Sequence, residues 1–307
     1  MKKPKIAVIV GPTAIGKSSL ALDLASEIGG ELISADSMQV YKHMDIGTAK
    51  PTPEERRKVK HHLIDVVFPD EQFSAALFKD QARNVIWSLN KKGKIPIVEG
   101  GTGLYIKALI KGLFKSPQTD PALRQALKEK AASDGNDSLH KELMEKDPST
   151  AERLHPNDTF RIIRALEVCS LTQKPLSEHL KKHNFNDSPF ETLHIGLHME
   201  RYRLYQRIEK RADMMISMGF VDEVMSLLEL GYSRDLNSMQ GLGYKQIVGY
   251  LMGESSLNEA VSQLKRETKR YAKRQVTWFN ANSEIDWHVF PDDYIKIRTK
   301  VRSFFEV

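Results

Sequence analysis

The sequence predicts a parallel α/β sheet with helices on both faces, interrupted by an all-helical insertion. Short apolar runs alternate with amphipathic helical patterns over the first hundred residues, which is typical of a parallel sheet. Residues 118–187 lack strand patterns and contain several prolines, whereas strand alternation returns at 192–198. We therefore expect an α/β core from residues 1–117 and 188–307, with a helical insertion domain between them.

The first strand is expected at Lys5–Val10, a short apolar run suited to a buried parallel strand. The next eight residues fit the pattern G-x-x-x-x-G-K-[ST], and residues 19–28 continue as an amphipathic helix. This order of strand, loop and helix directs backbone N–H groups and the positive helix end toward a phosphate chain. The chain is therefore predicted to bind a polyphosphate through a phosphate-binding loop (P-loop), and an ordinary glycine turn is the weaker alternative. The loop residues are Gly11, Pro12, Thr13, Ala14, Ile15, Gly16, Lys17 and Ser18.

The remaining elements follow from apolar spacing. Short, mostly apolar runs predict further strands at 31–35, 62–67, 95–98 and 192–198. Apolar residues at helical spacing predict helices at 75–90, 121–133, 138–147, 158–171, 176–183, 201–218 and 221–230. Gly219 and Gly231 follow the last two helices, where glycine commonly ends a helix. We expect Met215 and Met218 to pack in the core.

Polar residues follow three of the predicted strands. The P-loop follows the first strand, Asp36 follows the second, and Glu99 and Thr102 flank a glycine turn after the strand at 95–98. Because ligands bind at the carboxyl ends of parallel strands, these groups are expected to share one crevice. Asp36 is the leading candidate for a general base or metal carboxylate, and capping of the next turn is its alternative. Thr102 either faces the crevice or belongs to a plain turn, and Glu99 stands where a P-loop enzyme usually has aspartate.

Two sets of cations occur at helical spacing. Arg203, Arg207 and Arg211 recur every four residues, so they either face a phosphate or form a solvated face. Residues 265–274 carry six cations in two adjacent stripes, a pattern that a polyanion partner would explain and that a solvated face also allows. Nearby aromatic side chains are suited to stacking on bases or to the core; they are Tyr271, Trp278 and Phe279.

Composition limits the class of protein. The 307 residues are 40% hydrophobic and 28% charged, which indicates a globular chain with a core, and the formal net charge is a modest +6. A single cysteine, Cys169, excludes an internal disulfide framework. No apolar run approaches the ~20 residues that cross a bilayer, and the first strand begins too early for a signal peptide. We expect a cytoplasmic protein with no membrane partner, and nothing in the sequence implies a protein partner.

Eight motifs in order resemble the bacterial tRNA dimethylallyltransferases, the isopentenyltransferases of the IPP transferase family. They are the P-loop, Asp36-Ser-Met-Gln-Val-Tyr41, Asp45-Ile-Gly-Thr-Ala-Lys-Pro51, His61-His-Leu-Ile-Asp65, Gly100-Gly-Thr-Gly-Leu-Tyr105, Asn157-Asp-x-x-Arg161-x-x-Arg164, Gly243-Tyr-Lys245 and Arg270-Tyr-Ala-Lys-Arg-Gln275. The series spans nearly the whole chain, which makes the resemblance specific.

The resemblance implies transfer of a dimethylallyl group from its diphosphate to N6 of the adenosine immediately 3′ of the tRNA anticodon, with Mg²⁺ as cofactor. The P-loop would hold the prenyl diphosphate, and Asp36 would be the base. Thr102 and a helix arginine, Arg211 in preference to Arg207, would act at the reacting centre. Ser18 would bind Mg²⁺, with Asp36 or Glu99 contributing through water. The residues implied to contact tRNA are Asp36, Ser37, Met38, Gln39, Thr102, Arg124, Arg161, Arg164, Gly243, Tyr244, Lys245, Lys269, Arg270, Lys273 and Arg274.

Three other functions remain as alternatives. A small-molecule phosphotransferase would use the P-loop for ATP, but it leaves the basic segment unexplained. A prenyltransferase acting on free AMP or ADP would not need residues 118–187. An RNA-binding protein without catalysis would leave Asp36 and the second glycine turn without a role.

Overall fold

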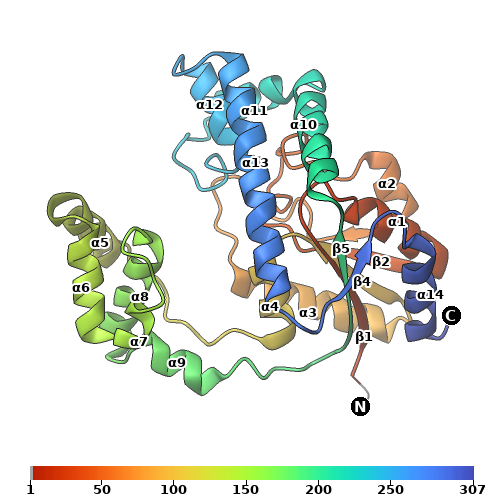
Figure 1. The fold of residues 1–307 in the computed structure, drawn as a ribbon, viewed down its shortest axis with the longest axis horizontal. Coiled ribbons are helices and arrows are strands. Elements are labelled where there is room, and N and C mark those ends of the chain that lie inside the picture. Colours follow the sequence, from red (N-terminus) through yellow and green to blue (C-terminus); the bar gives the residue numbers. More distant parts are fainter. Residues whose placement is uncertain (1–2) are drawn as a thin grey trace. The chain divides into compact units, whose positions relative to one another are not determined.

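A six-stranded parallel sheet organises the larger part of the chain, shown in a computed structural model that describes residues 3–307 (Figure 1). The strands are β1 (Lys5–Val10), β2 (Gly30–Ser34), β3 (His61–His62), β4 (Ile95–Gly100), β5 (Glu191–His198) and β6 (Asp286–Val289). Their order is β3-β2-β4-β1-β5-β6, and every pairing is parallel. The predicted α/β class with a parallel sheet is confirmed.

The chain divides into two compact units. One consists of the residues up to Ile110 together with Ser188–Val307, and the other is Lys111–Asp187. The helices of the larger unit are α1 (Lys17–Ile28), α2 (Pro53–Lys58), α3 (Ala75–Lys91), α4 (Gly103–Lys111), α10 (Arg201–Ser217), α11 (Phe220–Glu229), α12 (Tyr244–Leu251), α13 (Leu257–Asn280) and α14 (Tyr294–Phe305). Throughout residues 3–307, no helix is both long and apolar enough to span a bilayer.

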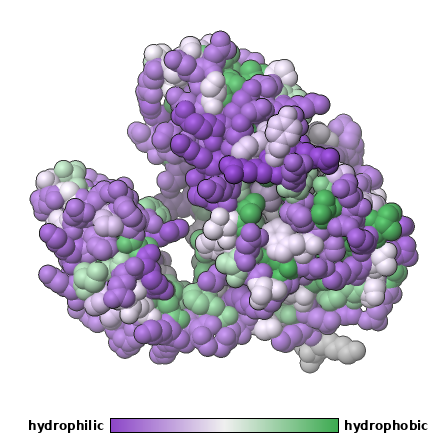
Figure 2. Space-filling model, in the orientation of Figure 1, coloured by the Kyte–Doolittle hydropathy of each residue, from purple (hydrophilic) through white to green (hydrophobic). Residues whose placement is uncertain are grey.

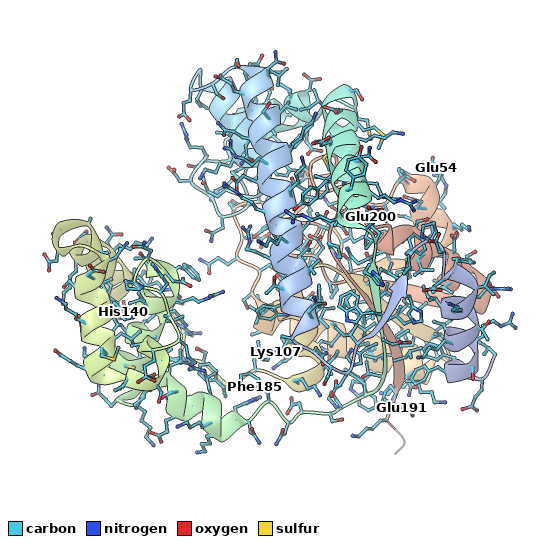
Figure 3. The ribbon with its side chains drawn as sticks, viewed as in Figure 1. Glu54, Lys107, His140, Phe185, Glu191 and Glu200 are labelled. Atoms are coloured by element: carbon cyan, nitrogen blue, oxygen red, sulfur yellow. The ribbon has the colours of Figure 1, made fainter. Side chains whose placement is uncertain are left out.

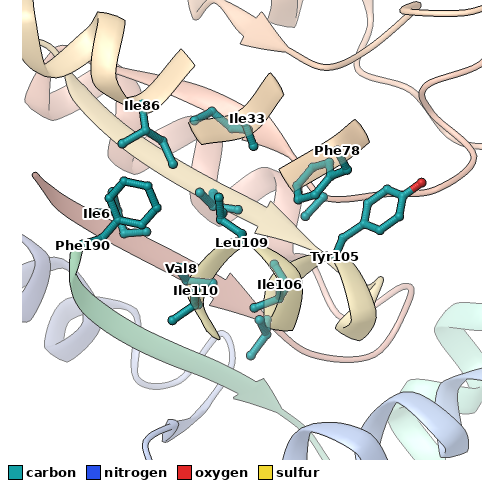
Figure 4. Close-up of a cluster of buried hydrophobic side chains, with 14 of the residues drawn as sticks. Ile6, Val8, Ile33, Phe78, Ile86, Tyr105, Ile106, Leu109, Ile110 and Phe190 are labelled. Carbon is teal, nitrogen blue, oxygen red and sulfur yellow. The ribbon is translucent and has the colours of Figure 1, made fainter. Parts of the chain in front are cut away.

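Alternate residues of β1 point to opposite faces of the sheet, so both faces need a cover. Ile6 and Val8 pack on one face with residues of α3 and α4, such as Phe78 and Leu109 (Figure 4). Ile9 faces the other side, where α1, α10 and α14 supply the apolar side chains. Helices therefore cover both faces, as the sequence predicts.

A third apolar cluster lies among α11, α12, α13 and the segment that follows β2. Its largest fully buried side chains include Phe220 and Tyr244, whose rings meet edge to face with centroids 5.0 Å apart. The Glu223 carboxylate accepts the Tyr244 hydroxyl at 2.6 Å and the backbone N–H groups of residues 45–47 at 2.6–3.1 Å. This network fixes the long loop after β2 against the helices.

The predicted strand at 62–67 is wrong beyond its first residue. Leu63 and Asp65 have positive φ angles of 63° and 56°, which an extended strand does not allow. The Asp65 carboxylate instead binds Lys50 at 2.5 Å and Arg56 at 2.6 Å, so this segment forms an ion-paired turn. Met218, expected in the core, is 61% exposed because it ends α10 at the surface.

The smaller unit consists of helices: α5 (Pro121–Asp134), α6 (Asn136–Lys146), α7 (Pro148–Ala151), α8 (Thr159–Thr172) and α9 (Leu176–His183). Leucine and isoleucine side chains of α5, α6 and α8 form its core. The Glu167 carboxylate is fully buried and accepts hydrogen bonds from Nε and Nη2 of Arg124 at 3.0 and 3.1 Å. It also accepts Arg164 and, at 2.9 Å, the backbone N–H of Asp120. Both arginines therefore belong to the internal packing of this unit.

Glu167→Gln should lower the free energy of unfolding of this unit by about 3 kcal/mol at pH 7, because it leaves two arginines without their buried counter-charge. Glu152→Gln changes an exposed glutamate of the same unit and serves as the control. Urea denaturation followed by circular dichroism measures both. Equal stability of the two variants would show that the Glu167 pairs contribute nothing net.

Candidate active site

A cavity of about 490 Å³ lies at the carboxyl ends of β1, β2 and β4. The P-loop, Asp36 and the turn after β4 all line it, so the three strand ends share one space. Side chains of α10 and α13 complete its walls. Figure 3 marks Glu200, the residue immediately before α10.

The P-loop has the backbone geometry of an anion site. Gly16 begins α1 with a φ of 108°, and a Cβ added there would lie 2.7 Å from the Phe290 ring, so only glycine fits. Five of the eight loop residues line the cavity, whereas Gly11 and Pro12 are buried elsewhere and the Ile15 side chain packs in the core. The helix start and the loop amides thus border the cavity.

Lys17 is buried at the cavity wall, and its Nζ donates to the Pro12 carbonyl at 2.9 Å. Burial lowers the pKa of Lys17 to about 8, against the opposing attraction of Glu99. A bound anion would raise this pKa again and keep the amine charged. The loop therefore holds a cation whose charge is matched to a phosphate ligand.

Two carboxylates face this lysine from neighbouring strand ends. Glu99 is buried and accepts the Ser18 hydroxyl at 3.2 Å, and burial raises the pKa of its carboxyl above the ordinary value. Asp36 Oδ1 accepts the backbone N–H groups of Met38 at 2.8 Å and Gln39 at 3.3 Å. Asp36 thus caps the turn and also lines the cavity, so the two interpretations of this residue are compatible.

Thr102 lies next to the lining residues at the end of β4. Its Oγ1 accepts the Ser37 backbone N–H at 3.0 Å and lies 3.3 Å from the Ser37 hydroxyl. Thr102 also contacts the Tyr271 hydroxyl, whose pKa rises to about 12, chiefly because of burial and secondarily because of Asp36. The threonine therefore links the turns after β2 and β4 beside the cavity.

The three arginines of α10 separate in the structure. Arg203 is exposed and lies 3.7 Å from Glu200, away from the cavity. Arg207 lines the cavity and its Nε donates to the Ala14 carbonyl of the P-loop at 2.8 Å. Arg211 also lines the cavity, where burial lowers the pKa of its guanidinium while Asp36 and Glu99 oppose that shift. Only Arg207 and Arg211 are placed to meet a ligand.

Two residues of α13 line the cavity although the sequence did not predict them there. Tyr271 and Gln275 lie one helical turn apart and both line the cavity. Gln275 Oε1 accepts the Thr13 N–H at 2.8 Å, and its Nε2 donates to the Gly101 carbonyl at 2.9 Å. Their i, i+4 spacing at the end of the basic segment could have identified a shared helix face, but the cations dominate the pattern there. The other unpredicted lining residues are Ser19, Thr48, Ala49, Lys210 and Met214.

The basic segment lies on α13, and hydrophilic side chains dominate this face of the helix (Figure 2). Acidic residues of α10 already pair with two of its lysines: Asp213 lies 2.6 Å from Lys265, and Glu209 binds Lys269. The alignment of these two lysines is therefore explained within the protein, and a polyanion partner for the segment stays a prediction. Arg270, Lys273 and Arg274 remain exposed, whereas Phe279 is in the core and Trp278 is 44% exposed.

Several residues implied to contact tRNA have other partners here. Tyr244 is completely buried with its hydroxyl on Glu223, which corrects its expected place on an RNA surface. Gln39 is buried, accepts Ser34 and donates to the carbonyls of Thr48 and Ala49. The backbone of Gly243 is also buried, while Lys245 is exposed and Ser37 and Met38 are half-buried.

In the smaller unit, Arg124 and Arg164 both pair with Glu167 and are partly exposed, so their contact with tRNA stays a prediction. Arg161 differs from them, since its side chain is 67% exposed and pairs with Asp158, three residues earlier on the same helix turn, at 3.0 Å. Among the described residues, no group of three or more histidine, cysteine, aspartate or glutamate side chains could hold a metal ion by itself.

Sequence comparison places these features in a known family. The family model described as IPP transferase matches residues 39–282. A protein named tRNA dimethylallyltransferase 2, from Geotalea uraniireducens, is 51% identical over 99% of this chain and 98% of its own length. The tRNA dimethylallyltransferase of Geobacter sulfurreducens is 50% identical over 99% and 97%.

Solved structures agree with this assignment. The full-length tRNA isopentenylpyrophosphate transferase of Bacillus halodurans superposes with a TM-score of 0.74 at 41% identity, covering 99% of this chain and 97% of that one. A eukaryotic dimethylallyltransferase acting on tRNA superposes with a TM-score of 0.81 at 30% identity, covering 98% and 77%. The P-loop, the acidic strand ends and the full-length similarity together show that this chain belongs to the IPP transferase family of tRNA dimethylallyltransferases.

Proposed function

We propose that this chain transfers a dimethylallyl group from dimethylallyl diphosphate to N6 of the adenosine immediately 3′ of the anticodon in tRNA, releasing diphosphate. The observation that supports this best is the single cavity that joins the P-loop to Asp36. The P-loop is suited to bind the leaving diphosphate, and Asp36 is suited to accept the proton that the attacking nitrogen loses. Transfer of an alkyl group to an amine needs both within reach of one reactant pair.

The leaving group requires most of the stabilisation. The adenine N6 lone pair is delocalised into the ring, so the amine is a weak nucleophile and the allylic carbon must become electrophilic. As the C–O bond breaks, negative charge accumulates on the diphosphate. Loop amides, Lys17 and Arg211 line the cavity and are positioned to bind that charge.

Ser18 at the start of α1 and Glu99 near the end of β4 fit a magnesium ion. Ser18 Oγ and Glu99 Oε2 lie 3.2 Å apart beside the loop, and both are the oxygen ligands that Mg²⁺ prefers. Mg²⁺ commonly takes one or two protein oxygens and completes its shell with water and substrate phosphates. When bound, it would neutralise charge on the diphosphate.

Asp36 is proposed to accept the N6 proton as the new C–N bond forms. Its Oδ1 is held by two backbone N–H groups, which fixes the carboxylate while it faces the cavity. Thr102 and Ser37 form the adjoining edge, where their hydroxyls are suited to the flipped base. Extruding that base costs a few kcal/mol, which contacts with the anticodon arm would offset.

The exposed cations Arg270 and Lys273 of α13 are the proposed contacts with tRNA phosphates, together with Lys245. Arg161 is the corresponding candidate in the smaller unit. The cytoplasm, where tRNA is modified, is the proposed location.

Labelled dimethylallyl diphosphate separates this function from its alternatives. Purified protein is incubated with the labelled donor and either unmodified tRNA or AMP. Label in tRNA alone supports the proposal, and label in AMP supports a prenyltransferase of free nucleotides. Turnover of ATP without prenyl transfer supports a phosphotransferase.

Asp36→Asn should lower the rate of transfer by about 10²–10⁴-fold, because the amide keeps the turn acceptor but does not take a proton at neutral pH. Binding of tRNA, measured by filter retention, should change little. Asp23→Asn changes an exposed aspartate of α1 and is the matched control. Normal turnover of the Asp36 variant would remove this residue from the mechanism.

The affinity for inorganic diphosphate should fall as pH rises above about 8, because Lys17 loses its charge there in the free protein and its charged form binds the anion. The loss is expected to approach tenfold per pH unit. Lys17→Arg stays charged throughout, so its titration curve should lack this component. Calorimetry between pH 6.5 and 9.5 measures both, and parallel curves would contradict a titrating Lys17.

Replacing Arg270 and Lys273 by alanine should weaken tRNA binding and reduce the slope of log K against log salt by about 1 for each tRNA phosphate that the variant no longer neutralises. Lys92→Ala removes an exposed cation after α3 and is the control. An unchanged slope in the double variant would assign these side chains to a solvated face.

A further inference from the structure

We propose that Gln275 positions the phosphate loop and couples diphosphate binding to RNA binding on α13. The proposal rests on the function above, because it assumes that both ligands occupy this chain together. Gln275 lines the cavity, but here it acts through the loop that it holds, so it is a positioning residue.

The Gln275 amide joins two loops that follow different strands. Its Oε1 accepts the Thr13 N–H of the P-loop at 2.8 Å, and its Nε2 donates to the Gly101 carbonyl after β4 at 2.9 Å. The side chain is only 6% exposed, so water does not readily replace either bond. One amide therefore sets the distance between the loop that grips phosphate and the turn beside Glu99.

The Gln275 amide is closely packed against the turn after β4. A Cβ at Gly101 would lie 2.1 Å from Gln275 Nε2, so the turn must be glycine for the bond to form. The neighbouring tie from α10, between Arg207 and the Ala14 carbonyl, comes from an exposed side chain. Of these two ties to the P-loop, the buried one belongs to α13.

The same helix carries the proposed RNA contacts. Lys273 and Arg274 immediately precede Gln275 and are exposed, while Gln275 points into the protein. They are part of one continuous helix of 24 residues, so a phosphate bound to these cations acts on the backbone that holds the glutamine. A phosphate held by these cations would thereby bias the position of Gln275 and of the loop it holds, and a bound diphosphate would favour RNA to the same degree, because coupling between binding sites is reciprocal.

The test measures the affinity for inorganic diphosphate by calorimetry, with and without saturating unmodified tRNA. In the natural protein, tRNA should tighten diphosphate binding by about tenfold. Gln275→Met keeps the side-chain length but loses both hydrogen bonds. We expect it to weaken diphosphate binding about tenfold and to reduce the effect of tRNA to less than twofold, while its affinity for tRNA alone stays within twofold.

Gln263→Met makes the same substitution at an exposed position of α13 and should leave all these values unchanged. Gln275→Asn, which is too short to span both partners, provides a second variant if the methionine form does not fold. If Gln275 only supports the fold, its replacement would weaken the binding of diphosphate equally with and without tRNA. That result would overturn the coupling. Absence of coupling in a natural protein that still prenylates tRNA also overturns it, whereas absence of prenylation rejects the proposed function instead.

Discussion

The parallel register of β1, β2 and β4 is the constraint on which the candidate site depends. In this register Val10 pairs with Gly100 and Ser34 with Glu99, so the loops after all three strands leave the sheet at one edge. Residues that are far apart in sequence, such as Ser18 and Glu99, are thereby brought within hydrogen-bond distance. The apolar packing on both faces maintains this arrangement, since a slip of one residue would move each strand's side chains to the opposite face, against helices whose packing they do not match.

Charge balance is the second requirement, because the cavity concentrates ionisable groups away from water. Burial disfavours the charged forms of Lys17, Glu99 and Arg211, and their mutual attraction only partly compensates. Two cations with unfavourable solvation make a site that gains from binding an anion. The pocket is thus preorganised for a highly charged ligand and is stabilised by it.

Local patterns predicted the fold class and the P-loop, because both depend on short-range spacing. The place of Asp36 in the cavity could be predicted in the same way, because the topology of a parallel sheet brings the carboxyl ends of its strands together. What the sequence did not reveal are properties of tertiary contact. The pairs of Asp213 with Lys265 and of Glu209 with Lys269 depend on which helices become neighbours. The same holds for the burial of Tyr244 against Glu223. The positive φ angles at Leu63 and Asp65 likewise occur in a turn that the apolar pattern does not reveal, where the Asp65 carboxylate pairs with Lys50.

Helix α13 has one side that the sequence predicts and another that only the fold defines. Its cations are visible as a pattern in the sequence, but its opposite side is defined only by the fold, where Tyr271 and Gln275 line the cavity. A helix with charge outside and polar, buried side chains inside is poorly explained by core packing alone, because an apolar residue would fill that space at lower desolvation cost. The glutamine is retained where two backbone groups, the Thr13 N–H and the Gly101 carbonyl, would otherwise lose their hydrogen-bond partner. The wall that separates the cationic surface from the cavity is therefore also the element that sets the geometry of the phosphate loop.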